Sequence, residues 1–401
     1  MIENQTVGGS SKRQPANAKE KTVEIQEGRI RSLAIGIALL ASAVASHLQA
    51  GENRWTSNGP TGERVLSLAI DSTDPANVYA GAESGGIFKT TNFGLTWSAA
   101  GTILVSVTNP VFSLSIDSVN SETILAGTQR GLFRSADAGG NWSRILSETT
   151  YILGANPAKP ATVYAGTARG VSKSTDGGAS WTEKLAAVAA IYGLVVDPQK
   201  PSTVYAADTE YYGAVLYKTG DDFRSWTQDV EKFYINRGAL AIDPKQPSTL
   251  YAGTVFPGGV FKSTDAGATW RAASGDLAEP VTAVAIDRHN PSTLYAGTSS
   301  LGVYKSADGG SSWEPFNAGL TQPTVDSLAI DASGTHLDAG TARGVFENHV
   351  SPIPCVPESD ALCLMGNRFQ LTLVARQLST GRVSAGRAVI KGDRFGYFSL
   401  P

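Results

Sequence analysis

A segment of about 43 residues recurs along this chain, and this repeat constrains the fold more than any other feature. Residues 65–349 repeat one order of motifs: a strand-like SLAID, a turn containing Pro, LYAGT, GVFKS, and a turn that ends in Trp. The Asp that closes the first motif stands at Asp71, Asp117, Asp197, Asp243, Asp287 and Asp331, with Asn156 in the third copy. All seven Trp follow the pattern, 39 to 45 residues apart: Trp55, Trp97, Trp142, Trp181, Trp226, Trp270 and Trp313.

Each copy holds three runs that alternate apolar with small or polar residues, and a fourth run begins at the Trp. Four strands at this period predict one blade of a β-propeller, whereas a helical solenoid needs helix-length periodic stretches. The seventh copy stops after GVFEN (residues 344–348), and an unmatched Trp strand surrounds Trp55. We therefore predict an all-β, seven-bladed β-propeller over residues 51–350, whose N-terminal strand completes the last blade and leaves no open sheet edge.

The turn before the Trp follows S-x-D-x-G-x-x-W in four copies. Its Asp can accept hydrogen bonds from backbone amides of the turn, its Gly can adopt positive φ, and its Trp can pack between blades. We expect these residues to be structural: Asp137, Asp176, Asp265 and Asp308, with Trp142, Trp181, Trp270 and Trp313. Weaker copies have Asn92 in place of Asp and Phe223 in place of Gly. A calcium loop is the alternative, but about six to eight oxygen ligands are needed and each turn offers one Asp.

With these turns, residues 51–350 resemble the Asp-box or BNR-repeat propellers. This group includes sialidases, sortilin-type receptors, xyloglucan-hydrolysing enzymes and the photosystem II assembly factors. The resemblance implies the fold, and because these relatives differ in function it does not transmit their chemistry.

The first fifty residues read as a leader with a signal peptide. An uncharged apolar run at residues 32–45 follows Lys21, Arg29 and Arg31, and cleavage is expected after Ala45 or Ala50. A retained membrane anchor is the weaker alternative, because the run is shorter than the roughly 20 residues that span a bilayer. We expect a secreted or periplasmic protein with no transmembrane segment in the mature chain.

The composition of the chain limits the classes of partner and ligand that it is expected to bind. Lys and Arg number 33 against 36 Asp and Glu, so the formal net charge is −3 and nucleic acid is not an expected partner. Two Cys and four His are too few for a cysteine/histidine metal site, and we predict no metal, no cofactor and a monomer.

Strand order assigns the two faces of the ring. In a four-stranded meander the first-to-second and third-to-fourth turns share one face, so the Asp boxes occupy it and a ligand is expected on the other. Blade four departs from the repeat on that other face, where its turn and its outgoing link place these candidates: Asp208, Glu210, Tyr211, Tyr212, Glu231, Tyr234 and Arg237. Aromatic rings beside Arg and carboxylates suit a sugar or a peptide. The alternative is that the rings fill a wider gap between blades.

Two further groups are candidates. The residue five before each strand-closing Asp or Asn should line the channel mouth, where three aromatic residues face a lone Asp: Leu66, Phe112, Tyr151, Tyr192, Gly238, Thr282 and Asp326. Arg130, Arg169 and Arg343 each lie in a T-x-R-G turn, and they superficially resemble the arginine trio with which sialidases bind a carboxylate. We favour the interpretation that these three arginines are solvent-exposed residues of the repeat consensus. Arg169 is nevertheless kept among the ligand candidates.

We predict a non-catalytic binding or scaffold propeller that recognises a glycan or an extracytoplasmic protein. The alternative is a glycoside hydrolase of sialidase or xyloglucanase type, with Tyr212 or an acid of blade four taking part. The sequence does not single out a pair of carboxylates as catalytic, and the Arg-Ile-Pro signature of sialidases is missing. His289 and His336 fall in first-to-second turns on the box face, away from the expected ligand. We therefore assign no catalytic residue.

Residues 351–401 form a separate, strand-rich piece. Cys355 and Cys363 lie eight positions apart, and export would allow a disulfide between them, with two free thiols as the alternative. The segment resembles a small β module found at the ends of exported bacterial proteins, and it stops soon after GYF, as a truncated module would.

Overall fold

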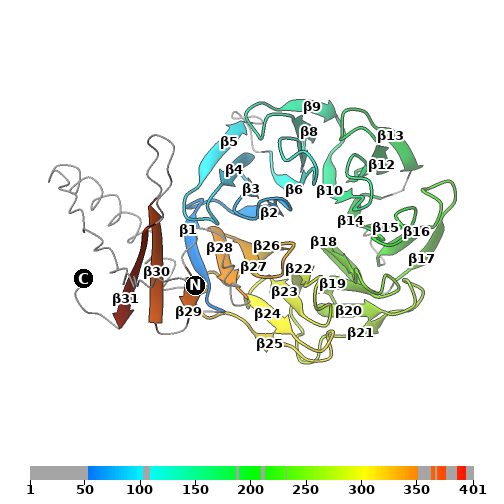
Figure 1. Ribbon diagram of the computed structural model, residues 1–401. Coiled ribbons are helices and arrows are strands. Elements are labelled where there is room, and N and C mark those ends of the chain that lie inside the picture. The colour runs from blue at the N-terminus through cyan, green and yellow to red at the C-terminus, as the bar shows by residue number, and fades with distance from the viewer. Residues whose placement is uncertain are drawn as a thin grey trace, which may run out of the picture. The chain divides into compact units, whose positions relative to one another are not determined.

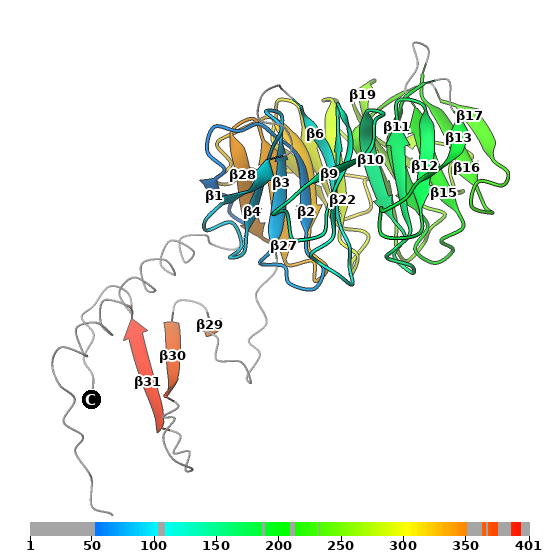
Figure 2. The same ribbon diagram turned by 90° about the horizontal axis from the view of Figure 1, so that it is seen from above.

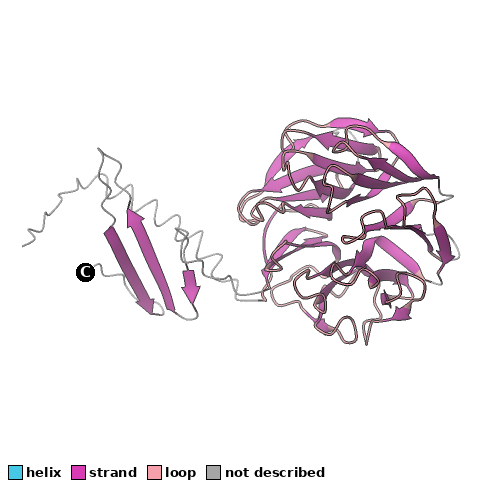
Figure 3. Cartoon of the chain, turned by 45° about the vertical axis from the view of Figure 1, so that its right-hand side comes forward, coloured by secondary structure: helices cyan, strands magenta, loops and turns pink. Residues whose placement is uncertain are grey.

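Seven four-stranded antiparallel sheets form a closed ring, the all-β propeller predicted from the repeat (Figure 1). The computed structural model describes residues 53–102, 109–186, 189–208, 213–231 and 233–350, and the backbone of strands at 363–365, 368–375 and 386–393. Regular structure in this described part of the chain consists of strands (Figure 3).

The blades follow one another in chain order. Blade one comprises β2 (Val65–Ile70), β3 (Val78–Ala82), β4 (Gly86–Thr90) and β5 (Ser98–Thr102). Blade two comprises β6 (Val111–Ile116), β7 (Ile124–Thr128), β8 (Gly131–Ser135) and β9 (Ser143–Leu146). Blade three comprises β10 (Thr150–Ala155), β11 (Val163–Thr167), β12 (Gly170–Ser174) and β13 (Thr182–Ala186). Blade four comprises β14 (Ile191–Val196), β15 (Val204–Asp208), β16 (Val215–Thr219) and β17 (Thr227–Val230).

The remaining blades continue the ring. Blade five comprises β18 (Tyr234–Ile242), β19 (Leu250–Phe256), β20 (Gly259–Ser263) and β21 (Arg271–Ala272). Blade six comprises β22 (Val281–Ile286), β23 (Leu294–Thr298), β24 (Val303–Ser306) and β25 (Glu314–Pro315). Blade seven comprises β26 (Val325–Ile330), β27 (His336–Thr341), β28 (Gly344–His349) and β1 (Thr56–Gly59).

The N-terminal strand closes the ring, as predicted. β1 pairs antiparallel with β28 through Thr56 opposite Glu347 and Gly59 opposite Val345. Figure 1 shows blue β1 beside orange β28. Trp55 is 2% exposed, and its Nε1 donates to the carbonyl of Phe316 in the link between blades six and seven at 2.6 Å. The unmatched Trp therefore anchors the closing strand in the core.

The second strand is buried along its whole length in six blades, and over its first five residues in blade five, because strands flank it and neighbouring blades cover both faces. The Gly of its YAG motif allows this approach. A Cβ on Gly81 would lie 2.5 Å from Cγ1 of Val111 in the next blade, closer than packed atoms permit. The repeated Gly thus sets how closely the blades pack.

The box turns carry the contacts expected of a structural motif. In blade five the Ser263 hydroxyl donates to Asp265 Oδ1 at 2.8 Å, and the Thr269 amide donates to the same oxygen at 2.8 Å. The Gly267 amide donates to Ser263 Oγ at 2.9 Å, and Trp270 Nε1 donates back to the Gly267 carbonyl. Asp137, Asp176 and Asp308 accept the same pair of bonds in their own turns, with Trp142, Trp181 and Trp313 following.

Predictions about both ends of the chain fall outside the described residues. The leader and signal peptide at residues 1–50 are not described, and neither is Cys355. Cys363 begins β29 (Cys363–Met365), which pairs with β30 (Arg368–Ala375) and through it with β31 (Gly386–Asp393), but only its backbone is described. The disulfide, the export signal and the domain boundaries stay predictions. Among the described residues no helix has the length and apolar character needed to cross a membrane.

Candidate functional site

The propeller presents two faces, and strand order fixes which loops belong to each. The box face carries the first-to-second turns and the box turns, such as residues 264–269. The link face, at the other end of the strands, carries the second-to-third turns and the links between blades, such as residues 316–324 (Figure 2). Because the inner strands begin at the link face, their second residues lie near the mouth of the central channel.

Three aromatic residues of neighbouring blades form a row at this mouth. Phe112, Tyr151 and Tyr192 are the second residues of β6, β10 and β14, and all three are half-buried. The rings of Phe112 and Tyr151 are stacked with centroids 5.5 Å apart, and the centroids of Tyr151 and Tyr192 are 4.6 Å apart. The aromatic row predicted from the repeat is therefore continuous across blades two, three and four.

Arg237 reaches this row from blade five. The pairing of β18 with β19 is irregular between Ile235 and Leu240, and Gly238 has a φ of +74°. The guanidinium carbon of Arg237 lies 4.0 Å from the centroid of Phe112 and 6.0 Å from that of Tyr151. Its Nε is buried and has no hydrogen-bond partner among the described residues. The charged guanidinium of Arg237 is thus held against aromatic faces, and its Nε–H can still donate a hydrogen bond.

Burial and charge act on these groups in opposite directions. Burial lowers the pKa of Arg237, and Tyr192, Tyr151 and Asp326 partly offset this effect. Burial and the neighbouring Tyr192 raise the pKa of Tyr151, while Arg237 acts to lower it. The guanidinium remains charged at neutral pH because its ordinary pKa lies far above that range.

An ion pair forms the side of the mouth at blades seven and one. Arg64 Nε and Nη2 donate to the two oxygens of Asp326 at 2.9 and 2.8 Å, and Arg64 Nη1 lies 3.4 Å from Glu83 Oε1. Asp326 is therefore not the lone acid that the repeat suggested. Sequence reasoning missed Arg64, although its position just before β2, next to the closing blade, was a usable signal.

The candidate residues of blade four have different environments in the structure. Asp208 is 1% exposed, and its carboxylate accepts bonds from the Val215 amide and the Tyr217 hydroxyl, both at 3.0 Å. This Asp therefore braces the second-to-third turn rather than facing solvent. Glu210, Tyr211 and Tyr212 lie outside the described residues.

Glu231 and Tyr234, at the two ends of the outgoing link of blade four, are half-buried. Burial raises the pKa of Glu231, and Asp229 adds to this effect. Tyr234 pairs with Phe256 across β18 and β19. Phe233 is buried against Phe261, with ring centroids 4.5 Å apart. This ring therefore fills the gap between blades, as the alternative interpretation of the blade-four aromatics expected.

The arginine trio shares a backbone feature. The amides of Arg130, Arg169 and Arg343 each donate to the hydroxyl of the Thr two residues earlier, and the three residues are exposed or nearly so. The Thr-x-Arg-Gly turn thus depends on Thr and on the backbone, which accounts for the repeat of the motif without a shared ligand.

Four exposed apolar side chains lie on the link face of blades four to six. They lie at the ends of β17 and β19 and in the turn after β23: Val230 at 69% exposed, Val255 at 45%, Phe256 at 71% and Leu301 at 45%. Large apolar side chains that stay exposed to water offer surface to which a partner can bind.

Two surface hollows open on the box face instead. A hollow of about 390 Å³ is lined by Lys262, Asp265 and Arg271, and one of about 270 Å³ by Ser72, Asp117 and Asn156. The larger one lies where Lys262 Nζ donates to the Gly309 carbonyl of the next blade at 2.9 Å. Its residues therefore serve contacts between blades.

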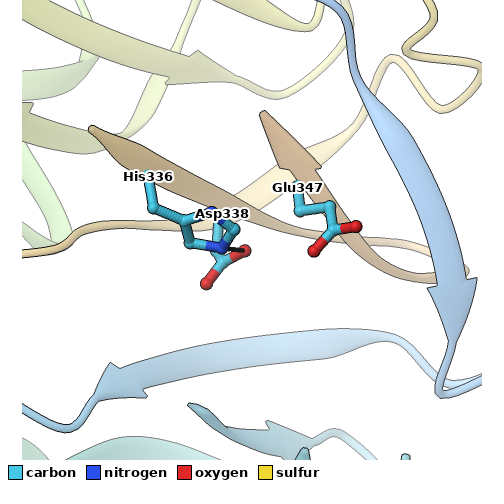
Figure 4. Close-up of side chains that lie close together, drawn as sticks. All are labelled: His336, Asp338 and Glu347. Atoms are coloured by element: carbon cyan, nitrogen blue, oxygen red, sulfur yellow. Dashed lines mark hydrogen bonds and ion pairs between the residues drawn. The ribbon is translucent and has the colours of Figure 1, made fainter. Parts of the chain in front are cut away.

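A buried cluster of ionisable residues lies in the closing blade (Figure 4). His336, Asp338 and Glu347 are 2%, 2% and 4% exposed, and His336 Nε2 lies 3.1 Å from Asp338 Oδ1. The prediction that His336 lies in a turn was wrong, because it begins β27 inside the blade. Burial favours a low pKa for His336, but Asp338 and Glu347 outweigh it and raise the value to about 9. Burial and Asp338 raise the pKa of Glu347 to about 8.

Comparisons with known proteins support the fold. The sequence matches no family model, and a search of curated proteins gives no match. Among solved structures, YCF48 from Cyanidioschyzon merolae is similar with a TM-score of 0.57 and 16% identity, over 74% of this chain and 98% of that one. The structure of YCF48 bound to D1 peptide is similar with a TM-score of 0.60 and 15% identity, over 75% of this chain and 98% of that one. A GH74 enzyme from Niastella koreensis is similar with a TM-score of 0.57 and 20% identity, over 84% of this chain and 59% of that enzyme. The chain is thus a seven-bladed propeller similar in fold to YCF48 and to part of a GH74 enzyme.

Proposed function

We propose that this protein is an exported, non-catalytic propeller that binds an extended segment of a partner protein on its link face, across the channel mouth. The observation that carries this proposal is Arg237, whose buried Nε lacks a hydrogen-bond partner among the described residues while its guanidinium stacks on Phe112. A buried donor without a partner is costly, and a carbonyl or carboxylate of a ligand would satisfy it.

The surroundings favour a protein segment over a glycan. The aromatic row can pack against apolar side chains, and Val255, Phe256 and Leu301 leave further apolar surface exposed on the same face in blades five and six. Arg64, Glu83 and Asp326 add charges of both signs beside the channel, which can fix the direction of a bound chain. YCF48, a structural neighbour, has been solved bound to D1 peptide, and this supports the choice of a peptide.

A glycoside hydrolase is the second candidate, because GH74 enzymes are among the structural neighbours and Glu231 has the raised pKa that suits a general acid. Two carboxylates flanking a bound sugar are normally required. Asp208 is buried and Asp326 is paired with Arg64, so neither is ready for that role. This chain spans 59% of the Niastella koreensis enzyme, and an enzyme site could depend on the remainder.

The test is a binding screen of the exported chain on peptide and glycan arrays, followed by affinity measurement for the best ligand. We expect peptide ligands whose affinity falls at least about tenfold in Arg237→Ala, as for loss of a desolvated charged contact. Arg343→Ala is the matched control, because Arg343 is an exposed arginine in a second-to-third turn of the same face. Equal affinity of both variants would place the site elsewhere, and turnover of xyloglucan or a sialoside would overturn the non-catalytic assignment.

A further inference from the structure

A pair of side chains recurs on the second and third strands of the blades. In five blades a Tyr on the second strand faces a Lys on the third, and the ammonium lies 5.1 to 5.9 Å from the ring centroid. These pairs are Tyr79 with Lys89, Tyr164 with Lys173, Tyr205 with Lys218, Tyr251 with Lys262, and Tyr295 with Lys305. Blade two keeps the cation as Arg134, opposite Leu125.

In blades one to five a side chain at one of these two positions bonds to the next blade. In blade five, Lys262 Nζ and the Tyr251 hydroxyl donate to the carbonyl of Gly309, in the box turn of blade six, at 2.9 and 3.3 Å. In blade two, Arg134 Nε donates to the Gly177 carbonyl at 2.9 Å in the same way. A positive side chain at this position therefore supplies a bond between blades.

Blade seven reverses the charge of this pair. Asp338 stands where the Tyr would be, and Glu347 stands opposite it where the Lys would be. His336 replaces the Thr or Asn that begins the corresponding stretch in the other copies. All three side chains are at least nine-tenths buried. Two neighbouring buried carboxylates repel each other, and a cation bound between them would offset this repulsion.

The geometry provides ligand atoms for such a charge. Ligating atoms of the three residues all lie within 4.8 Å of one another, and Figure 4 shows the side chains gathered on adjacent strands. His336 Nδ1 and Asp338 Oδ2 are buried and have no hydrogen-bond partner among the described residues. The next blade covers the cluster closely, since a Cβ on Gly94 would lie 2.9 Å from Glu347 Oε2.

We propose that His336, Asp338 and Glu347 bind a divalent transition-metal cation of the Zn²⁺ class between blades seven and one. One imidazole nitrogen with two carboxylates is a ligand set that such cations accept, whereas Ca²⁺ and Mg²⁺ prefer oxygen alone. Metal–ligand bonds of about 2.0–2.2 Å require the three side chains to draw together by about 1 Å. A backbone carbonyl or a water would complete the coordination.

The location gives this cation a structural role. Thr56 Oγ1 of the closing strand donates to Glu347 Oε1 at 3.3 Å, and Thr56 is also opposite Glu347 in the ladder. A cation here would tie β27 and β28 to the blade-one turn at Gly94 and support the pairing of β1. It would replace, at the point of ring closure, the bond from a cationic side chain that links blades two to five each to the next one.

The experiment compares the full chain with a variant that restores the repeat, His336→Thr/Asp338→Tyr/Glu347→Lys. After chelation, Zn²⁺ is titrated by calorimetry, with Mn²⁺ and Ca²⁺ as comparison ions, and Tm is measured with and without Zn²⁺. We expect one Zn²⁺ per wild-type chain and a rise in Tm of at least about 3 °C. The restored variant should fold without a Zn²⁺ response at this site.

The single variants Asp338→Asn and Glu347→Gln keep the shape of the site and remove one charged ligand each. We expect each to weaken Zn²⁺ binding at least about tenfold. Equal Zn²⁺ responses in the wild type and the restored variant, or no response in the wild type, would overturn the proposal. Because the cluster lies in the closing blade and not at the channel mouth, peptide binding is read separately and does not decide this result.

Discussion

Arg237 of blade five crosses the channel mouth and places its guanidinium carbon 4.0 Å from the ring centroid of Phe112 in blade two. Three blades separate the two residues along one side of the ring and two along the other, so no local sequence motif connects them. The contact joins opposite walls of the mouth and defines the candidate binding surface.

Replacing the ring tests the energetic value of this contact. We expect Phe112→Leu to lower the free energy of unfolding by about 1 kcal/mol beyond its lost packing, since a partly desolvated cation over an aromatic face contributes about that much. Urea unfolding measures the change. Phe112→Tyr keeps the aromatic face and should remain close to wild type, and equal losses in both variants would show that ring electrostatics do not matter here.

Removing Trp55 tests the closing strand. This side chain is 2% exposed and donates to the Phe316 carbonyl, so Trp55→Ala should cost about 3–5 kcal/mol in free energy of unfolding. Trp226 holds the equivalent sequence position in blade four but is 46% exposed, and Trp226→Ala should cost less than about 1 kcal/mol. Chemical denaturation of the two variants side by side measures the contrast. Similar losses would contradict closure as the special role of Trp55.

The box aspartates predict how stability responds to acid. Backbone and side-chain hydrogen bonds within the turns lower the pKa of Asp137, Asp176, Asp265 and Asp308, and of Asp221 in the weaker box turn of blade four, to about 2. A folded pKa below the unfolded value means that the stabilisation is complete above pH about 4 and is lost as pH falls through 2. The urea midpoint of the wild type should therefore fall steeply between pH 4 and 2.

Asn92 supplies the control for this pH effect. Its Oδ1 accepts the Thr96 amide at 3.0 Å, so an amide side chain can hold the turn without titrating. Changing the five box aspartates to Asn should leave a folded protein whose midpoint changes less between pH 4 and 2. Equal acid sensitivity of the variant would assign the effect to other carboxylates.

Much of the fold follows from local patterns, whereas the site depends on contacts between distant blades. The Trp spacing and the unmatched strand at Trp55 predict the closed ring because each blade must bury the face of its neighbour. The partner of Asp326 is Arg64, which lies 262 residues away in sequence and reaches it only through ring closure. The position of Arg237 depends on an irregular strand pairing around Gly238, which sequence periodicity does not encode. Asp338 and Glu347 were visible as departures from the Tyr and Lys of the repeat, once the copies are aligned by strand.

The repeated Gly of the second strand predicts a packing limit. Gly81→Ala would place its Cβ 2.4 Å from Ser67 Oγ and 2.5 Å from Val111 Cγ1, so blades one and two must separate. We expect a loss of about 1–3 kcal/mol in free energy of unfolding, typical of an overfilled core, measured by urea denaturation. Gly220→Ala is the control, because its nearest contact is Lys200 Nζ at 3.8 Å, and its stability should change by less than about 0.5 kcal/mol. A tolerated Gly81→Ala would show that the blades are not in limiting contact.

The ion pair at the mouth predicts a change in binding with little change in stability. Arg64 and Asp326 are joined by two hydrogen bonds, yet the Arg64 side chain is 42% exposed, so solvent screens the pair. A double-mutant cycle with Arg64→Ala and Asp326→Asn should give a coupling free energy of about 0.5–1 kcal/mol for unfolding, smaller at high salt. If a ligand chain crosses the mouth, each single variant should slow its association more than it destabilises the fold, because charges at the rim of an interface mainly control encounter. Stopped-flow association rates at two salt concentrations measure this effect, and rates that match the wild type at low salt would remove the ion pair from the binding surface.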